Sequence, residues 1–122
     1  MSRELVMIVD DDDEIRNALE DVLLGEGYTV VGARDGLQAL KYLKQGKRPS
    51  AILLDLWMPV MDGWQLRDEL LKDEKLSKIP VIVLTAARDQ RAGSLHVTEV
   101  LTKPVELGRL LDVLDGATAT PH

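Results

Sequence analysis

Side chains that can bind charged oxygens stand where apolar runs of the sequence end. Asp10 and Asp11 follow LVMIV, Asp55 follows AILL, Thr85 follows VIVL, and Lys103 comes just after VTEVL. If these runs are neighbouring strands, three carboxylates, a hydroxyl and an ammonium converge. Oxygen ligands without a neighbouring His or Cys favour hard cations, so we expect Mg²⁺ or Mn²⁺ at this site.

Four consecutive aspartates, Asp10 to Asp13, raise a question of their own because adjacent carboxylates repel one another. We assign Asp10 and Asp11 to the metal side of the site. Asp12 and Asp13 are expected to be exposed at the start of a helix, where a carboxylate caps free N–H groups and is favoured by the helix dipole. The pattern leaves open whether Asp12 or Asp13 is the cap.

The same set of residues suits phosphoryl transfer. Magnesium held by few protein groups keeps waters and picks up phosphate oxygens. Lys103 and Thr85 would neutralise and orient the transferring group. Asp55 is the candidate nucleophile, which would become an aspartyl phosphate. An acid that ends a buried strand is costly unless it is paired or metal-bound, so a purely structural explanation of Asp55 is weak.

Apolar runs and helical spacing alternate along the chain, which predicts a parallel sheet covered on both faces. Ligands are then expected beyond the carboxyl ends of the strands. The expected strands are Leu5–Val9, Tyr28–Ala33, Ala51–Leu56, Val81–Ala86 and Val97–Leu101. Helices are expected around Ile15–Leu23, Leu37–Leu43, Trp64–Leu71 and Leu107–Leu114, with a weak pattern of at most two turns between Ala87 and Thr98.

Composition sets further bounds. With 122 residues the chain is expected to be one domain over 1–116 and a disordered tail over 117–122. A net charge of −6 with scattered basic residues argues against direct binding to nucleic acid or to a membrane surface. The absence of cysteine excludes disulfides and thiolate metal sites and fits a cytoplasmic protein. His96 has no ligand partner at a useful spacing and is given no role.

Four motifs together resemble the receiver domain of bacterial two-component response regulators, over about residues 4–115. They are VDDD at Val9–Asp12, LLDLWMPVMDG at Leu53–Gly63, VIVLTA at Val81–Ala86 and LTKPVEL at Leu101–Leu107. The resemblance implies an α/β fold with a doubly wound, five-stranded parallel sheet, flavodoxin-like, in strand order 2-1-3-4-5. It also implies a histidine kinase or histidine phosphotransfer protein as the phosphodonor, and output by docking to a partner.

The resemblance also implies a role for each site residue. Asp55 would be the phosphoacceptor, and Asp11 a direct metal ligand. Asp10 would act on the metal largely through water, and the backbone carbonyl of Trp57 would complete the metal shell. Thr85 and Lys103 would bind the phosphoryl group, and the Lys103–Pro104 peptide would be cis. Such a domain is not an enzyme beyond slow hydrolysis of its own phosphate.

Two departures from the family concern the output. The interval from Thr85 to Lys103 is shorter than usual by about one helical turn, or about four residues, so the fourth helix is expected to be shortened. Val100 stands where the family has an aromatic residue that moves with the threonine. Trp57, two residues after Asp55, is a candidate for controlling the access of water to the phosphate.

Two other functions compete with this interpretation. A degenerate receiver would keep the fold as a phosphorylation-independent interaction module, which Val100 and the short fourth helix favour and the complete acid, threonine and lysine set disfavours. A haloacid-dehalogenase-like phosphatase also uses Asp, Thr, Lys and Mg²⁺. Its nucleophile follows the first strand and has a second acid two residues later, whereas Asp55 follows the third strand and Trp57 stands at that position.

Overall fold

A single parallel sheet forms the centre of the computed structural model, which describes residues 4–86 and 97–118. Its strands are β1 (Leu5–Val9), β2 (Thr29–Ala33), β3 (Ala51–Asp55), β4 (Val81–Ala86) and β5 (Glu99–Lys103). Every neighbouring pair is parallel, and the strand order is β2-β1-β3-β4-β5. The expected α/β class, parallel sheet and strand order are confirmed.

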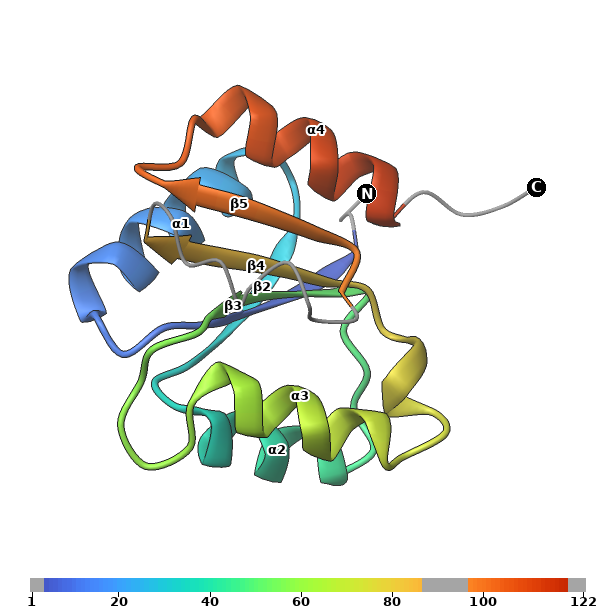
Figure 1. Ribbon diagram of the computed structural model, residues 1–122. Helices are drawn as coiled ribbons and strands as arrows, with labels where there is room; N and C mark the ends of the chain where they lie inside the picture. The colour runs from blue at the N-terminus through green and yellow to red at the C-terminus, as the bar shows by residue number, and fades with distance from the viewer. Residues whose placement is uncertain (1–3, 87–96, 119–122) are drawn as a thin grey trace.

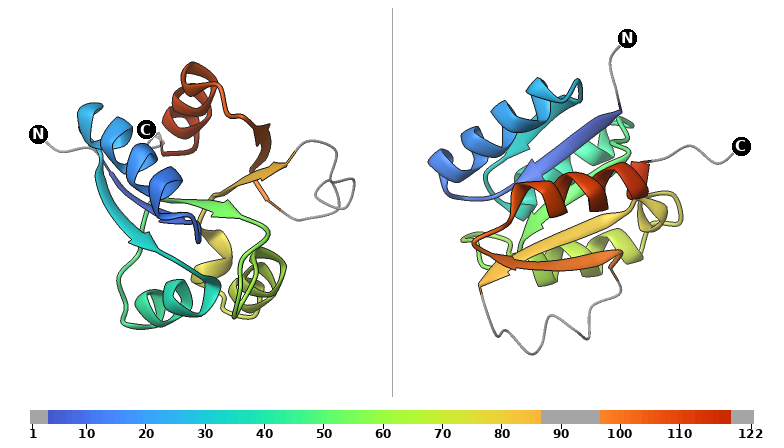
Figure 2. Two further views of the ribbon diagram at one scale, coloured as in Figure 1. Left: turned by 90° about the vertical axis from the view of Figure 1, so that its left-hand side faces the viewer. Right: turned by 90° about the horizontal axis from the view of Figure 1, so that it is seen from above.

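Helices cover both faces of this sheet. They are α1 (Asp13–Gly25), α2 (Gly36–Lys44), α3 (Gly63–Leu71) and α4 (Leu107–Thr118), with one 3₁₀ turn, η1 (Leu76–Lys78). Figure 1 shows α2 and α3 together below the sheet and α1 and α4 above it, and Figure 2 shows the same two layers from other sides. The crossovers between parallel strands place the helices in this way.

Two hydrophobic clusters, one on each face, explain the apolar runs. Along β1, Met7 and Val9 pack toward α2 and α3, while Val6 and Ile8 pack toward α1 and α4. Side chains alternate between the faces of a strand, so a strand that is covered twice must be apolar at every position. The central strand β3 is buried from Ala51 to Asp55.

An aspartate N-cap begins each of the first three helices. Asp12 accepts hydrogen bonds from the backbone N–H of Glu14 and Ile15, so Asp12 rather than Asp13 is the cap of α1. Asp35 caps α2, and Asp62 caps α3 in a reciprocal capping box with Gln65. Each cap satisfies helix N–H groups that otherwise lack partners.

The end of the chain differs from the expected boundaries. Strand β5 is Glu99–Lys103 rather than Val97–Leu101, because its ladder with β4 pairs Ile82 with Glu99 and Ala86 with Lys103. Helix α4 continues through Thr118, two residues into the segment expected to be a tail. The short helix expected between Ala87 and Thr98 falls mainly on residues outside the described ranges, as does the rest of the tail.

Candidate functional site

Three carboxylates meet at the carboxyl ends of β1 and β3. Asp10 and Asp11 follow β1, and Asp55 is the last residue of β3. Each offers an oxygen atom, and these atoms all lie within 4.8 Å of one another. Asp10 is 2% exposed and Asp55 is 8% exposed, whereas Asp11 faces solvent. One exposed and two buried carboxylates are thus close enough to contact the same small ligand.

Lys103 brings a positive charge into this group from β5. Its Nζ lies 3.5 Å from Oδ2 of Asp10 and 3.7 Å from Oδ1 of Asp55. These are ion-pair distances, and they are longer than hydrogen bonds between charged groups. The peptide bond from Lys103 to Pro104 is cis, as the resemblance implied.

Burial raises the pKa of Asp55, and it is the largest influence on this group. Lys103 lowers the pKa, Asp10 raises it, the backbone N–H of Trp57 lowers it, and Asp11 raises it. Lys103 therefore offsets only part of the cost of ionising Asp55. A further positive charge would favour the ionised carboxylate.

The oxygen set fits a divalent cation. Asp10 Oδ1 accepts a hydrogen bond of 2.9 Å from the N–H of Asp12, but Asp10 Oδ2 is buried and has no hydrogen-bond partner in the described ranges. Three carboxylates against one ammonium leave an excess of negative charge beside this oxygen. Mg²⁺ and Mn²⁺ prefer such an all-oxygen set.

Thr85 and Trp57 lie beside the acids. In the ladder of β3 and β4, Asp55 pairs with Leu84, so Thr85 is one residue further toward the carboxyl end. Its hydroxyl is buried and lacks a hydrogen-bond partner within residues 4–86 and 97–118. The backbone N–H of Trp57 donates to Oδ1 of Asp55 at 3.3 Å, while the Trp57 residue is 48% exposed.

The Trp57 ring lies next to the ring of Trp64, the second residue of α3. The ring centroids are 6.2 Å apart and the planes are tilted by 59°. Such tilted pairs are favourable beyond the area that they bury. The ring pair therefore joins the loop after Asp55 to the start of α3.

The side chains of Val100 and Lys103, both in β5, lie on opposite faces of the sheet. It pairs with Val83, is half-buried, and packs against the cluster under α2 and α3. Lys103 points to the other face. A valine has no ring to move and has few populated rotamers.

Arg16, which had not been predicted, supports the site from α1. Its Nη1 donates a hydrogen bond of 2.6 Å to the backbone carbonyl of Asp10, and its Nη2 pairs with the Asp13 carboxylate. The i, i+3 spacing from Asp13 indicates the ion pair. The hydrogen bond to the Asp10 carbonyl depends on how the chain folds between β1 and α1, and no sequence pattern predicts it.

Two glycines also support the loop that follows Asp55, and their role had not been predicted. A Cβ on Gly63 would lie 2.6 Å from the backbone oxygen of Asp55 and 2.8 Å from Cα of Leu56. A Cβ on Gly36 would lie 2.7 Å from the backbone oxygen of Met61, to which Gly36 donates a hydrogen bond of 2.8 Å. The starts of α2 and α3 are therefore in direct contact with this loop.

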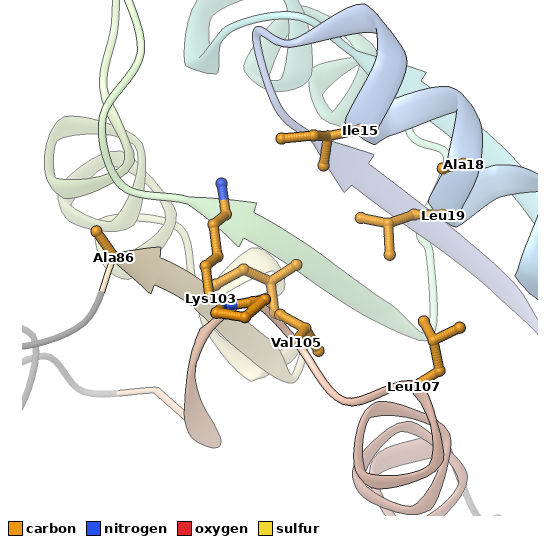
Figure 3. Close-up of a pocket in the computed structure, with 9 residues that line it drawn as sticks. Ile15, Ala18, Leu19, Ala86, Lys103, Val105 and Leu107 are labelled. Atoms are coloured by element: carbon orange, nitrogen blue, oxygen red, sulfur yellow. The ribbon is translucent and has the colours of Figure 1, made fainter.

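An apolar hollow of about 550 Å³ adjoins Lys103. Figure 3 shows Ile15, Ala18 and Leu19 of α1 on one side, and Val105 and Leu107 on the other, with the Lys103 side chain at its edge. Ile15 and Leu107 are partly exposed although both are large and aliphatic. Exposed aliphatic surface beside a polar site is typical of contact with another protein.

Comparisons with known proteins agree with this geometry. The family model described as the response regulator receiver domain matches residues 6–115. The transcriptional regulatory protein AfsQ1 of Streptomyces coelicolor is 34% identical over 111 residues, which are 88% of this chain and 47% of that protein. The chain spans between 33% and 54% of the length of the first four transcriptional regulators that it matches.

Solved structures show the same similarity. A response regulator receiver protein from Pseudomonas putida has a TM-score of 0.85 and 32% identity, with 95% of this chain and 98% of that chain covered. The receiver domain of a sensor histidine kinase from Pseudomonas aeruginosa PAO1 has a TM-score of 0.89 and 27% identity, with 98% and 100% covered. That structure has a magnesium ion coordinated in its active-site cleft.

Proposed function

Because the chain belongs to the response regulator receiver domain family, the signal-receiving domains of two-component systems, we propose that it accepts a phosphoryl group on Asp55. The family is a signalling family rather than a class of enzymes. The observation that carries the proposal is the position of Asp55, which is buried at the end of β3 with Lys103 3.7 Å away and two further acids beside it. Two-component signalling is then the context in which this carboxylate acts.

The proposed reaction is a displacement at phosphorus. An oxygen of the Asp55 carboxylate attacks, the new P–O bond forms, and the P–N bond to the donor imidazole breaks. The electron pair of that bond stays on the imidazole nitrogen, which then takes a proton. Mg²⁺ held by Asp11, Asp55 and the Trp57 carbonyl, with Asp10 acting through water, would neutralise charge on the phosphoryl oxygens.

Lys103 and Thr85 would hold the transferred group. The ammonium already lies between Asp10 and Asp55 at ion-pair distance, so it can bind a phosphoryl oxygen without a large movement. The buried Thr85 hydroxyl, which has no partner in the described part of the chain, can donate to another oxygen. A buried hydroxyl without a partner is costly, and a bound phosphoryl oxygen would remove this cost.

The proposed phosphodonor is a histidine kinase or a histidine phosphotransfer protein. A donor imidazole must reach Asp55, so the donor covers the surface around Lys103. The hollow between α1 and the loop before α4 lies on that surface and offers aliphatic contact area (Figure 3). A location in the cytoplasm remains a prediction. None of the helices in residues 4–86 and 97–118 has the length and hydropathy of a transmembrane span.

Slow hydrolysis of the aspartyl phosphate would end the signal. Trp57 flanks Asp55, because its backbone N–H donates to the Asp55 carboxylate and the residue is 48% exposed. We propose that its side chain limits the access of water to the phosphate. We expect Trp57→Ala to shorten the lifetime of the phosphate. Output would occur by docking to a partner protein.

The second candidate is a receiver that acts as an interaction module independently of phosphorylation. Val100 favours it, since a half-buried valine in β5 cannot make the movement of an aromatic ring. The two candidates differ in whether the pocket reacts. They therefore make opposite predictions for a phosphodonor of low molecular mass.

The deciding experiment is intact-mass analysis after incubation with acetyl phosphate and Mg²⁺. The proposal predicts a single phosphoryl adduct that is absent in Asp55→Asn and absent with a chelator. Asp62→Asn is the matched control, because Asn also caps α3 and the Asp62 carboxylate is not one of the three clustered acids. If the phosphate is too short-lived to detect, a titration with beryllofluoride, which mimics the phosphoryl group, still tests the pocket. The absence of both an adduct and beryllofluoride binding would favour the interaction module.

A further inference from the structure

Arg67 is a buried guanidinium on α3, away from the acid cluster. The residue is 7% exposed, and its Nε and Nη1 atoms are buried without a hydrogen-bond partner among the described residues. Burial lowers the pKa of Arg67. No salt bridge joins it to an acid within residues 4–86 and 97–118. A buried positive charge is rarely left in this state, because buried charges are normally paired.

The buried Arg67 guanidinium destabilises the folded chain unless a hydrogen-bond acceptor binds to it. An unpaired buried guanidinium loses hydration at several N–H groups and gains no protein acceptor for the two nitrogens. A leucine would cause no such loss, and Leu66 and Leu70 on the same helix are completely buried. Nη2 is the one guanidinium nitrogen outside this buried set, so an acceptor bound from solution would offset the loss by contact with Nη2.

Arg67 is one of the residues that line a surface hollow of about 340 Å³. Its lining includes Ser77 and Lys78 at the 3₁₀ turn, Val81 at the start of β4, and Thr98 just before β5. It lies at the starts of these strands, whereas Asp55 and Lys103 stand at strand ends. The hollow is therefore separate from the phosphoacceptor site.

More positive charge lies next to this hollow. A second hollow of about 480 Å³ shares Lys78 with the first and adds Arg48, Lys75 and Glu74. The pKa of the nearby Asp73 is lowered mainly by hydrogen bonds from two backbone N–H groups. The charges of Arg48 and Lys75 lower it further. In a chain with a net charge of −6, basic side chains outnumber acids in the lining of the two hollows. The local charge thus favours an anion.

We infer that the hollow at Arg67 binds a small oxyanion, a phosphate or carboxylate group of a free solute, through Arg67 and Lys78. Arg67 supplies fixed donors at the base, and Lys78 supplies a mobile ammonium at the rim. Arginine suits this task because its planar guanidinium matches the oxygens of both groups.

The experiment follows the Arg67 Nε–Hε signal by ¹H–¹⁵N NMR. The whole chain is titrated separately with sodium phosphate and with sodium citrate, against sodium chloride at matched ionic strength. Divalent metal is first removed from the protein and from all solutions with a chelating resin, so that phosphate does not enter the acid cluster with a metal. The expected result is a saturable shift of the Arg67 signal with phosphate, with citrate or with both, and none with chloride.

Matched variants separate binding from general electrostatics. Arg67→Gln should abolish the saturable response in the backbone amide signals of Lys78 and Thr98, and Lys78→Gln should weaken it about tenfold, which corresponds to about 1.4 kcal/mol. Arg109→Gln removes the same charge from an exposed residue of α4 and should change nothing. Arg67→Leu, which is expected to fold at least as stably as the parent chain, checks that loss of binding is not loss of fold.

Two results would overturn the inference. One is a response to phosphate and citrate no larger than the response to chloride, which would mean screening alone. The other is binding that persists in both Arg67 variants. Asp55→Asn should bind the anion normally, so the outcome is independent of whether the phosphoacceptor pocket reacts.

Discussion

Lys103 Nζ lies 3.7 Å from Oδ1 of Asp55, near enough to attract the carboxylate and too far to donate a strong hydrogen bond. The same nitrogen is 3.5 Å from Oδ2 of Asp10. One ammonium is thus shared by two buried acids and satisfies neither completely. The pocket has a deficit of positive charge, and the first predictions follow from this deficit.

Removal of the Lys103 charge should destabilise the chain at neutral pH. In Lys103→Gln, Asp10 and Asp55 remain buried without their counter-charge, so we expect a loss of about 1 kcal/mol in the free energy of unfolding. The loss should become smaller in acid, where the carboxylates are protonated. Urea denaturation at two pH values measures both effects, and Lys72→Gln, on an exposed side chain, should cost almost nothing.

Replacement of Asp55 should stabilise the metal-free protein. Folding raises the pKa of Asp55 above 3.8, so the folded state holds the proton more tightly. The stability of the parent chain therefore falls as pH rises through the folded pKa, whereas Asn has no such dependence. Asp55→Asn should melt at a higher temperature than the parent at pH 7 in a chelator, and the difference should disappear below pH 3.8. A difference of the opposite sign at pH 7 would contradict the assignment.

Mg²⁺ should stabilise the folded chain through the acid cluster. A ligand that binds only the folded state contributes about 1.4 kcal/mol at about ten times its dissociation constant. Differential scanning fluorimetry with increasing Mg²⁺ should show this rise in the parent chain and a much smaller rise in Asp11→Asn. Asp12→Asn is the control at the neighbouring position, because Asn also caps a helix and the same charge is removed. Equal responses in the two variants would exclude Asp11 as a ligand.

Gly63→Ala should be strongly destabilising for a glycine substitution. The new Cβ would meet the backbone of Asp55 and Leu56 at 2.6 and 2.8 Å, and backbone atoms of a buried strand cannot move aside cheaply. We expect a loss of about 1–3 kcal/mol, measured by chemical denaturation. Gly25→Ala is the matched change at the end of α1, where a Cβ meets nothing within 4 Å, and it should be neutral or slightly stabilising.

Val60→Asn should stabilise the chain. Val60 has a φ of 68°, a left-handed conformation that is unfavourable for a β-branched residue, and the residue is 74% exposed. Asn accepts this conformation more readily, so a gain of about 1 kcal/mol is expected. Val60→Ala removes the branching but keeps the Cβ and should give a smaller gain. A variant less stable than the parent chain would show that the Val60 side chain contributes contacts of its own.

Much of the fold was predictable because its signals are local. Doubly covered strands must be apolar throughout, and Asp12, Asp35 and Asp62 are of a residue type that is favoured as a helix N-cap. The residues of the acid cluster could be named because strand ends in a parallel sheet share one edge. The strand order came from the resemblance to a family.

Features that depend on tertiary contacts could not be read from the residues. The boundaries of β5 follow from its register with β4 rather than from its composition. The bond from Arg16 to the Asp10 carbonyl and the close approach of Gly63 to Asp55 exist only in the folded chain. Arg67 looks like an ordinary surface residue of an amphipathic helix, and only its burial shows otherwise.

The pair of Trp57 and Trp64 gives the protein an optical property. The chain holds two tryptophans: Trp57 is in the loop that follows Asp55, and Trp64 is the second residue of α3. All indole fluorescence therefore originates from two neighbouring rings, and with their centroids 6.2 Å apart we expect the two chromophores to be electronically coupled. Quenching or a change in exciton circular dichroism would report charge arriving at Asp55 in real time, in a sample that carries no label.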